Sequence, residues 1–324
     1  MNTQVHYRLL LTFTMIFVAV SGCKHEQKTT TKINGDGTCE RTIVIKSASD
    51  TTSSFPLPKD QGWVTHIEGD TEKIFVSCKK FDDVNQMNND YRIPGKIGVS
   101  VKFDKQFRWF YTYYNYQEIY KSYFPFNKIP LKTFLTTEEY ERCEKGDTSK
   151  VLQERQNEFF LRNVSEEFYG QLVDSVENLR DPSLPVSVFQ AKRAEFINSC
   201  ADIFKDSKDD IGNLEKILGL KLRGKLENQI DGIKKLINIK VDFMMNASGS
   251  YVNEVVMPGI ILNTNASTVE GNKVSWKLDE GRFQCVDYTM NVESRIANPW
   301  VTYATGGILI VLVALLMLPR LTRK

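Results

Sequence analysis

Three histidines and six cysteines are the residues of this chain best suited to nucleophilic, redox or metal chemistry. His6 and His25 lie close to the N-terminus, so only His66 falls in the body of the chain. Zinc sites use three or four clustered His, Cys or acidic ligands, and one histidine does not supply such a set. Complete H-E-x-x-H, G-x-S-x-G, G-x-x-x-x-G-K-[ST] and G-x-G-x-x-G motifs are absent. The sequence therefore predicts no metal, no cofactor and no catalytic residues of a recognised type.

Cys23 differs from the other cysteines because it follows an apolar run and a short motif of small residues. It follows the apolar run Leu9–Val20 and the short motif Val20, Ser21, Gly22. This arrangement resembles the bacterial lipobox, which implies that the thiol receives a diacylglyceryl group and that cleavage leaves an acylated, palmitate-bearing Cys23. The apolar run spans about 18 Å as a helix, too short for a bilayer core of roughly 30 Å. We predict a lipoprotein signal peptide over residues 1–22 and a polar tether over residues 23–32. The alternative is an ordinary secretory signal.

Residues 300–318 form an uncharged apolar run that would extend about 28 Å as a helix, enough to cross a membrane. We predict a transmembrane helix over residues 299–319 and a cytoplasmic basic tail over residues 320–324. The expected membrane-interface residues are aromatic before the run and basic after it: Trp300, Tyr303, Arg320, Arg323 and Lys324. Basic residues stay on the cytoplasmic side, so the body of the chain is expected outside the cytoplasm. The alternative is a buried apolar helix of a soluble domain.

The overall charge is balanced, with 42 basic and 40 acidic side chains. Four of the basic residues lie outside residues 24–299, namely Arg8, Arg320, Arg323 and Lys324, and no acidic residue does, which leaves 38 basic against 40 acidic residues in the body. Nucleic-acid-binding surfaces are strongly basic. The charge balance therefore predicts no nucleic-acid partner.

Five cysteines remain besides Cys23, and outside the cytoplasm they are free to oxidise. The preferred candidate disulfide joins Cys39 and Cys78, because both lie in early predicted strands that are expected to be neighbours. A bridge between Cys143 and Cys200 is the second choice, and a fully reduced set is the alternative. There is no C-x-x-C spacing, which argues against a thioredoxin-like or zinc-knuckle role.

The body divides into a β-rich part over residues 33–127, a helical insertion over residues 128–238 and a second β-rich part over residues 239–298. Alternating β-branched and aromatic residues predict strands, and apolar steps of three or four residues predict helices. Thr136 and Glu139 have the spacing of a capping box at a helix start. The main predicted segments are strands at 38–46, 63–68, 73–81, 97–103, 108–116, 240–251, 260–264, 273–278 and 282–292, and helices at 151–179, 188–204 and 214–237. We expect an α+β fold, in which an antiparallel β-sheet domain carries a central helical insertion and is followed by the C-terminal transmembrane helix.

The aromatic run at residues 108–116 allows two interpretations. Stacked aromatic side chains bind sugars or bases, but tyrosine-rich strands more often fill a core with one face. We favour the core interpretation.

Several short motifs at the two edges of the body resemble the LppM type of bacterial envelope lipoprotein domain. They are Ile33–Thr38 with its N-G-D-G turn, Gly62-Trp63, Lys79–Asp82, Met257–Gly259, Asn263–Asn265, Gly271–Leu278, and Tyr288–Ser294 followed by Asn298 and one membrane helix. The resemblance covers the edges and leaves the central helices out. It implies an envelope lipoprotein of α+β fold, with lipid or glycolipid binding in some members, and it supplies no catalytic residues.

These observations together predict a lipoprotein of the bacterial cell envelope, attached to the cytoplasmic membrane with its main domain on the extracytoplasmic side. The predicted partners are the membrane itself and either an amphiphile or an envelope protein, bound without catalysis. An assembly scaffold is one alternative, and we expect it to show an exposed apolar stripe on residues 188–237. A hydrolase or transferase whose site is built from scattered residues around His66 is the less favoured one.

Overall fold

The computed structural model describes residues 26–47, 62–68, 73–91, 97–145, 147, 149–203, 210–246, 250–278 and 283–321. The predicted signal peptide, the lipobox with Cys23, and Arg323 and Lys324 of the basic tail lie outside the described residues. The chain divides into two units. The sheet unit contains Met1–Lys121, Gly249–Glu280 and Tyr288–Lys324, and the helical unit contains Ser122–Ser248 and Gly281–Asp287.

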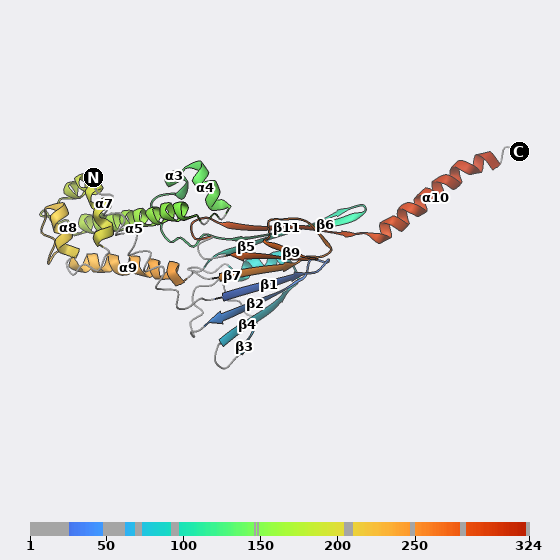
Figure 1. The fold of residues 1–324 in the computed structure, drawn as a ribbon, viewed down its shortest axis with the longest axis horizontal. Coiled ribbons are helices and arrows are strands. Elements are labelled where there is room, and N and C mark those ends of the chain that lie inside the picture. Colours follow the sequence, from blue (N-terminus) through green and yellow to red (C-terminus); the bar gives the residue numbers. More distant parts are fainter. Residues whose placement is uncertain are drawn as a thin grey trace. The chain divides into compact units, whose positions relative to one another are not determined.

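The sheet unit is built on two β-sheets (Figure 1). The first has seven strands in the order β3-β4-β2-β1-β7-β10-β9. Their bounds are β1 (Glu26–Ile33), β2 (Cys39–Ser47), β3 (Val64–Glu68), β4 (Lys73–Phe81), β7 (Ser250–Val256), β9 (Thr268–Glu270) and β10 (Lys273–Leu278). Its strand pairs are antiparallel except β1 with β7, which are parallel and bring the early and late parts of the chain together.

The second sheet has four strands in the order β5-β6-β11-β8, all antiparallel. They are β5 (Val99–Arg108), β6 (Tyr111–Tyr120), β8 (Ile260–Thr264) and β11 (Tyr288–Ala297). Gly259 precedes β8 at a positive φ of 81°, and a Cβ there would lie 2.1 Å from the carbonyl oxygen of Arg295 on β11. Glycine is therefore required where β8 approaches β11.

The two sheets pack face to face, because side chains from both meet in one core. Tyr120 of β6 contacts Tyr251 of β7 with ring centroids 6.5 Å apart, and Glu118 of β6 bonds to Arg41 of β2. A short 3-10 helix η1 (Val84–Gln86) and helix α2 (Met87–Asp90) add Val84 and Met87 to this core. The predicted strand over residues 108–116 is wrong in its bounds, because Arg108 ends β5, Trp109 and Phe110 lie in the turn, and β6 begins at Tyr111. The core interpretation is confirmed for Tyr114 and Tyr116, which are buried, and wrong for Trp109 and Phe110, which are exposed.

The prediction of a tether over residues 23–32 is wrong for Glu26 onward, because these residues form strand β1 between β2 and β7. The strand lacks apolar periodicity because its buried face is polar, with Gln27, Thr29 and Thr31 pointing inward. Hydrophobic alternation is the usual signal for a half-buried strand. Here the same alternation exists, but between buried polar and exposed polar residues.

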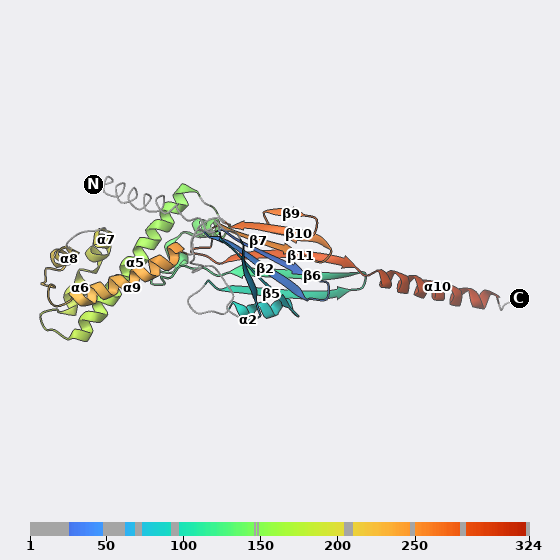
Figure 2. The ribbon, with the colours of Figure 1, turned by 90° about the horizontal axis from the view of Figure 1, so that it is seen from below.

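The helical unit contains seven helices in its described residues (Figure 2). They are α3 (Leu131–Phe134), α4 (Thr137–Glu144), α5 (Lys150–Leu179), α6 (Val186–Ala191), α7 (Arg193–Ile203), α8 (Asp210–Leu218) and α9 (Glu227–Asn246). The predicted capping box is confirmed at the start of α4: the Thr136 hydroxyl accepts from the Glu139 N–H at 3.2 Å, and the Glu139 carboxylate accepts from the Thr136 N–H at 2.9 Å. The predicted periodicity of α5 is also confirmed, since Phe160, Val164, Phe168, Leu172 and Val176 are buried.

The predicted strand at residues 240–251 is wrong in its first part, because helix α9 continues to Asn246. Ile230, Ile233, Ile237 and Met244 are all buried, at intervals of three, four and seven residues. This helical spacing continues through the segment, and one buried helix face outweighs the short β-branched alternation around Val241. The strand β7 begins only at Ser250.

Helix α10 (Pro299–Leu321) follows β11 after the single residue Asn298 (Figure 1). Its segment Pro299–Met317 is long and apolar enough to cross a membrane. From Ile308 to Met317 most of its large apolar side chains are exposed. A soluble core helix would bury such side chains against its own domain.

Candidate functional site

The outer face of the four-stranded sheet carries an open groove of about 780 Å³. All four strands of this sheet contribute to it, together with the residue after β8. The lining residues are Lys102, Phe103, Asp104, Asn115, Tyr116, Gln117, Asn263, Thr264, Asn265, Asn291, Val292 and Glu293. Because Val101, Tyr116 and Val292 point into the core, strand alternation turns their neighbours outward into the groove.

The strand register aligns the polar side chains of the groove in two rows. Lys102, Gln117 and Asn291 lie opposite one another in one row. Asp104, Asn115, Glu293 and Asn263 form the next row. Side chains at directly opposed positions of antiparallel strands are close enough to interact, and the Gln117 Nε2 donates to the Asn291 Oδ1 at 3.0 Å. The groove surface is therefore lined across all four strands by amide and charged side chains in two adjacent rows.

One end of the groove is fixed by Asn265. Its Oδ1 accepts from the backbone N–H of Asn291 at 2.9 Å and from the Trp276 Nε1 at 2.9 Å. Its Nδ2 donates to the carbonyl oxygen of Thr289 at 2.7 Å. The nearby Thr264 hydroxyl donates to the carbonyl oxygen of Asn291 at 2.7 Å. These bonds hold the segment after β8 against β11, so this wall of the groove is preorganised.

The chemistry available in the groove is hydrogen bonding. Carboxamides both donate and accept, and they are joined by one ammonium group and two carboxylates from Lys102, Asp104 and Glu293. Such a set matches a hydroxyl-rich ligand, which also donates and accepts at each position. No Ser, Cys or His side chain is among the residues that line the groove.

A second polar cluster lies inside the sandwich. The Arg41 Nη2 donates to the Glu118 Oε1 at 2.6 Å, while the Tyr116 hydroxyl and the Asn253 Nδ2 both donate to the Glu118 Oε2 at 2.7 Å. The Arg41 Nη1 donates to the Thr31 hydroxyl at 3.2 Å. Arg41 and Glu118 are almost wholly buried. The cluster joins β1, β2, β6 and β7, and we assign it to the structure of the sandwich.

The charges of this cluster stabilise each other. Burial opposes the charge of Arg41, but attraction to Glu118 raises its pKa above the usual value. Burial also raises the pKa of Tyr116 above its usual range and that of Tyr91 to about 12. The Arg41 guanidinium lies 5.0 Å from the Tyr91 ring centroid. Both tyrosines are therefore neutral at physiological pH; Tyr116 donates to Glu118, and Tyr91 supplies a ring surface to Arg41.

His66 lies on strand β3, where every side chain is exposed. Its Nε2 lies 2.9 Å from the Glu68 Oε1, and this partner is exposed as well. This His–Glu pair is exposed and does not line the groove. The described residues also contain no group of three His, Cys, Asp or Glu side chains that could hold a metal ion.

The predicted disulfide between Cys39 and Cys78 is absent, and both thiols are free. The strands β2 and β4 are neighbours as expected, but Cys39 lies opposite Phe81 while Cys78 lies opposite Thr42. Since Thr42 and Cys39 are three residues apart on one strand, their side chains leave opposite faces of the sheet. Cys143 is also free, and the side chain of Cys200 lies outside the described residues.

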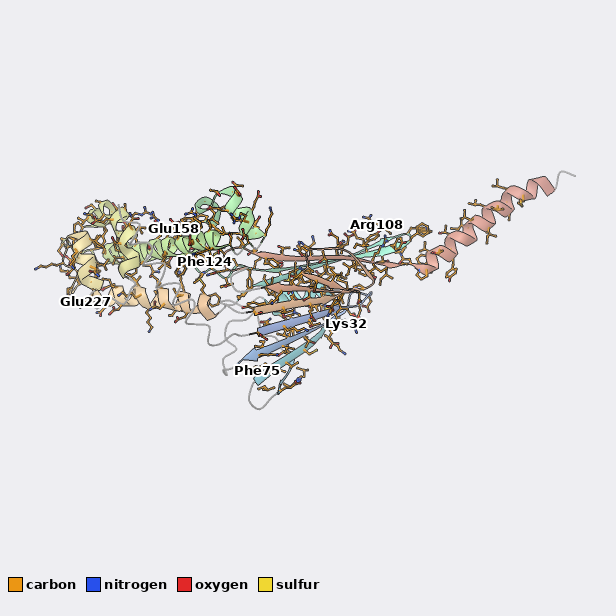
Figure 3. All side chains as sticks on the ribbon, viewed as in Figure 1. Lys32, Phe75, Arg108, Phe124, Glu158 and Glu227 are labelled. Carbon is orange, nitrogen blue, oxygen red and sulfur yellow. The ribbon has the colours of Figure 1, made fainter. Side chains whose placement is uncertain are left out.

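The predicted membrane-interface residues that the structure describes lie on helix α10. Trp300 and Tyr303 are exposed on its first turns, and Arg320 lies in its last turn. Trp300 is stacked on Phe107 of β5, with ring centroids 6.0 Å apart. The hairpin turn between β5 and β6, which contains Trp109 and Phe110, is thus brought beside the start of α10 (Figure 3).

The fold and the groove define an α+β protein with a polar, amide-lined sheet face next to a helix of membrane-spanning length. No protein-family model matches the chain, and no curated protein matches it. Among solved structures, it is similar to the NMR structure of the folded domain of Mycobacterium tuberculosis LppM, with a TM-score of 0.31 and 10% identity. That match covers 86% of this chain and 93% of the LppM domain. A likeness of this size supports no statement about the function of the present chain.

The groove was not predicted from the sequence, although alternating polar residues in two of its strands are visible there. Asn115 and Gln117, like Asn291 and Glu293, are polar residues two apart that alternate with buried residues. Each strand alone has the ordinary pattern of a half-solvated strand. The groove arises only from the register that sets these pairs beside each other, and register is a tertiary property.

Proposed function

We propose that this chain is a membrane-anchored lipoprotein of the bacterial cell envelope whose sheet unit binds the hydroxyl-rich headgroup of an amphiphile, such as a glycosylated lipid. The observation that carries the proposal is the path of β11. This strand lines the groove with Asn291 and Glu293 and then, after Asn298, becomes helix α10. A ligand in the groove is therefore held within one strand length of the segment that enters the membrane.

The groove favours a polar ligand over an acyl chain. Apolar ligands are usually bound in enclosed pockets lined by aliphatic and aromatic side chains, whereas this groove is open and lined mostly by amides and charges. Saccharide hydroxyls would replace the water that now solvates these groups, at little cost in hydrogen bonds. The acyl chains of such an amphiphile would remain in the bilayer.

The proposed location is the extracytoplasmic side of the cytoplasmic membrane. The lipobox sequence ending in Cys23 and the basic residues Arg320, Arg323 and Lys324 support this orientation. A single acyl modification is a weak anchor and a spanning helix a permanent one. We therefore assign retention to α10 and assign to lipidated Cys23 the positioning of strand β1, which begins only three residues later at Glu26.

The proposal is tested with the full-length chain in phosphatidylglycerol nanodiscs that contain increasing fractions of a glycosylated diacylglycerol. A soluble oligosaccharide panel is titrated in parallel by calorimetry. The double variant Asn115→Ala/Gln117→Ala removes two hydrogen-bonding side chains, each worth about 0.5–1.5 kcal/mol, so binding is expected to weaken about tenfold. The matched control is His66→Ala, an exposed change on the other sheet that is expected to leave binding unchanged.

Saturable binding that the groove variant weakens and the control does not would support the proposal. No saturable signal from any saccharide or glycolipid, or equal weakening by both variants, would overturn it.

A docking scaffold is the second alternative, and the helical unit gives it little support. Within the described part of residues 188–237, Leu236 is the exposed large apolar side chain, and Ile239 follows it one turn later on α9. Two neighbouring apolar residues are ordinary for a soluble surface. The exposed stripe that the scaffold hypothesis requires is not formed by these residues.

A further inference from the structure

The turn between β5 and β6 exposes aromatic side chains to an unusual degree. Phe107 is 54% exposed, Trp109 48% and Phe110 49%. Large aromatic residues at a hairpin tip bury little against their own domain, and a group of them indicates an interaction surface. We call these three residues the hairpin tip.

The hairpin tip lies against the beginning of helix α10. Phe107 stacks on Trp300 at 6.0 Å, and Trp109 meets the same ring edge-on at 6.4 Å. The Trp109 Nε1 donates to the Thr305 hydroxyl at 3.0 Å. The hairpin tip is thus level with the first turns of the helix, between Pro299 and Thr305.

Asn298 holds the two parts together. Its backbone N–H donates to the carbonyl oxygen of Phe110 at 2.8 Å, and its Oδ1 accepts from the Thr112 hydroxyl at 2.9 Å. Its Nδ2 reaches the carbonyl oxygens of Arg108 and Trp109, at 3.3 Å each. One side chain and its backbone therefore bind every part of the turn, so the hairpin and the start of α10 form a single element.

Two arginine side chains lie on aromatic rings beside this element. The guanidinium of Arg108 lies 5.2 Å from the Tyr113 ring centroid, and that of Arg295 lies 4.3 Å from the Tyr111 ring centroid. Arg108 is at the hairpin end of the sheet in Figure 3. Ile260, which pairs with Arg295 on the neighbouring strand, adds a 70% exposed apolar side chain. Arginine side chains near a membrane surface are attracted to anionic headgroups, and exposed aromatic side chains favour the membrane interface.

We infer that the hairpin tip docks into the headgroup layer of the same membrane that α10 crosses, on anionic phospholipids. The inference rests on that part of the proposed function which places α10 in a bilayer, and it does not depend on the groove. Trp300 and Tyr303 lie in the first turns of α10, where a helix that crosses a membrane passes through the interface, and aromatic residues of this kind favour that position. The contacts from Trp109 and Phe107 to this turn bring the hairpin tip to the same depth. The docked tip fixes the sheet unit, and its groove, at the membrane surface.

The test uses tryptophan fluorescence of the full chain in vesicles of phosphatidylglycerol and phosphatidylcholine that contain lipids brominated near the headgroup. Three variants are compared with the unmodified chain: Trp109→Phe, Trp300→Phe and Trp63→Phe. Bromine quenches only indoles at membrane depth, and phenylalanine retains an aromatic ring while removing the fluorophore. We expect a large part of the quenched signal to disappear in Trp109→Phe and in Trp300→Phe, and none of it in Trp63→Phe. The Trp109-dependent quenching should fall when phosphatidylglycerol is omitted, and also in Arg108→Gln.

The outcomes distinguish docking of the hairpin tip from membrane insertion of α10. Quenching that depends on Trp300 but not on Trp109 would overturn the docking of the hairpin tip and leave the membrane helix in place, and this result is also expected if a second copy or another protein covers the tip. Quenching that depends on neither residue would show that α10 is not inserted, which would overturn both the inference and the anchoring proposal. If the Trp109-dependent quenching is the same with and without phosphatidylglycerol, the assignment of anionic phospholipid as the ligand would be overturned.

Discussion

Three hydrogen-bond donors converge on the carboxylate of Glu118 in the middle of the sandwich. Arg41 supplies the only charge among them, and it is itself buried against Thr31, Met87 and Tyr91. A buried ion pair gains little over a well-packed apolar pair, but removing one partner leaves an uncompensated charge. The cluster therefore adds register and orientation to the two sheets more than it adds stability.

The substitution Glu118→Gln tests this reasoning. A carboxamide has one accepting oxygen, so it cannot receive all three donors, and the charge of Arg41 is left unpaired. We expect the free energy of unfolding to fall by about 3–5 kcal/mol, measured by urea denaturation of the full chain in detergent. Glu293→Gln, the same change at an outward-facing position on the neighbouring strand, should change stability by less than about 0.5 kcal/mol. Equal effects of the two substitutions would contradict the assigned role.

Single residues were predictable where the chemistry is local. Thr136 and Glu139 interact within one turn, and their spacing alone specifies the bond pattern. Cys39 and Cys78 were placed on neighbouring strands correctly, but the choice of face depends on a register that is fixed by all the other pairs of β2 and β4. The groove side chains could not be predicted for the same reason: their alignment depends on the register between four strands, and the sequence of a single strand does not specify that register.

At the scale of elements, β1 and α9 show where pattern reasoning fails. The inward face of β1 is polar because Thr31 bonds to Arg41 and because Thr29 and Gln27 lie in the same buried row. A strand that serves a buried polar cluster has no hydrophobic alternation to detect. Long helices such as α5 were predicted well, since thirty residues of consistent spacing outweigh any local ambiguity.

The pairing of α5 with α9 makes the helical unit sensitive to acid. Glu167 on α5 accepts from Lys240 of α9 at 2.8 Å and from Gln171 at 2.8 Å. Burial opposes its charge, but these bonds and the charges of Lys240 and Lys128 lower its pKa below the ordinary 4.5. A carboxyl whose pKa is lowered by folding stabilises the folded state above its unfolded pKa, and this contribution disappears as the pH falls through the folded value.

We therefore expect the helical unit to lose stability as the pH falls below about 4.5, the value for an unperturbed glutamate. In Glu167→Gln this part of the acid dependence should be missing, because the side chain no longer titrates. Hydrogen exchange of α5 and α9 amides between pH 6 and pH 3, corrected for the intrinsic rate, measures it. Gln171→Ala, which removes a neutral partner of Glu167 and keeps its charge, should retain the acid dependence. An unchanged profile in Glu167→Gln would be evidence against the linkage.

For the whole molecule, the decisive arrangement is that, by our proposal, the sheet unit is joined to the membrane both through β11 and α10 and through β1 and Cys23. The strands β1 and β7 pair in parallel, so the start and the later part of the chain meet in one sheet. Glu26, where β1 begins, pairs with Ser250, whereas the other end of β1 leads to Gly35, whose carbonyl oxygen accepts from Tyr114 and Lys105 near the β5–β6 hairpin. A lipid on Cys23 would therefore attach at the end of the sheet unit away from the start of α10. By our proposal the two anchors hold opposite ends of the sheet unit, so the acyl chain orients the sheet unit while α10 provides retention.

The substitution Cys23→Ala separates these two roles. We expect the variant chain to remain in the membrane fraction through α10, and its mass to lack the acyl groups. Deletion of residues 300–318 in the Cys23 background should leave a lipid-attached chain that high salt does not release but that exchanges between vesicles, since a lipid anchor is weaker than a spanning helix. Intact-mass spectrometry of membrane-extracted protein and flotation with vesicles measure both properties. Release of Cys23→Ala into the soluble fraction would show that lipidation, and not α10, retains the protein, and acyl groups persisting in that variant would place the modification at another residue.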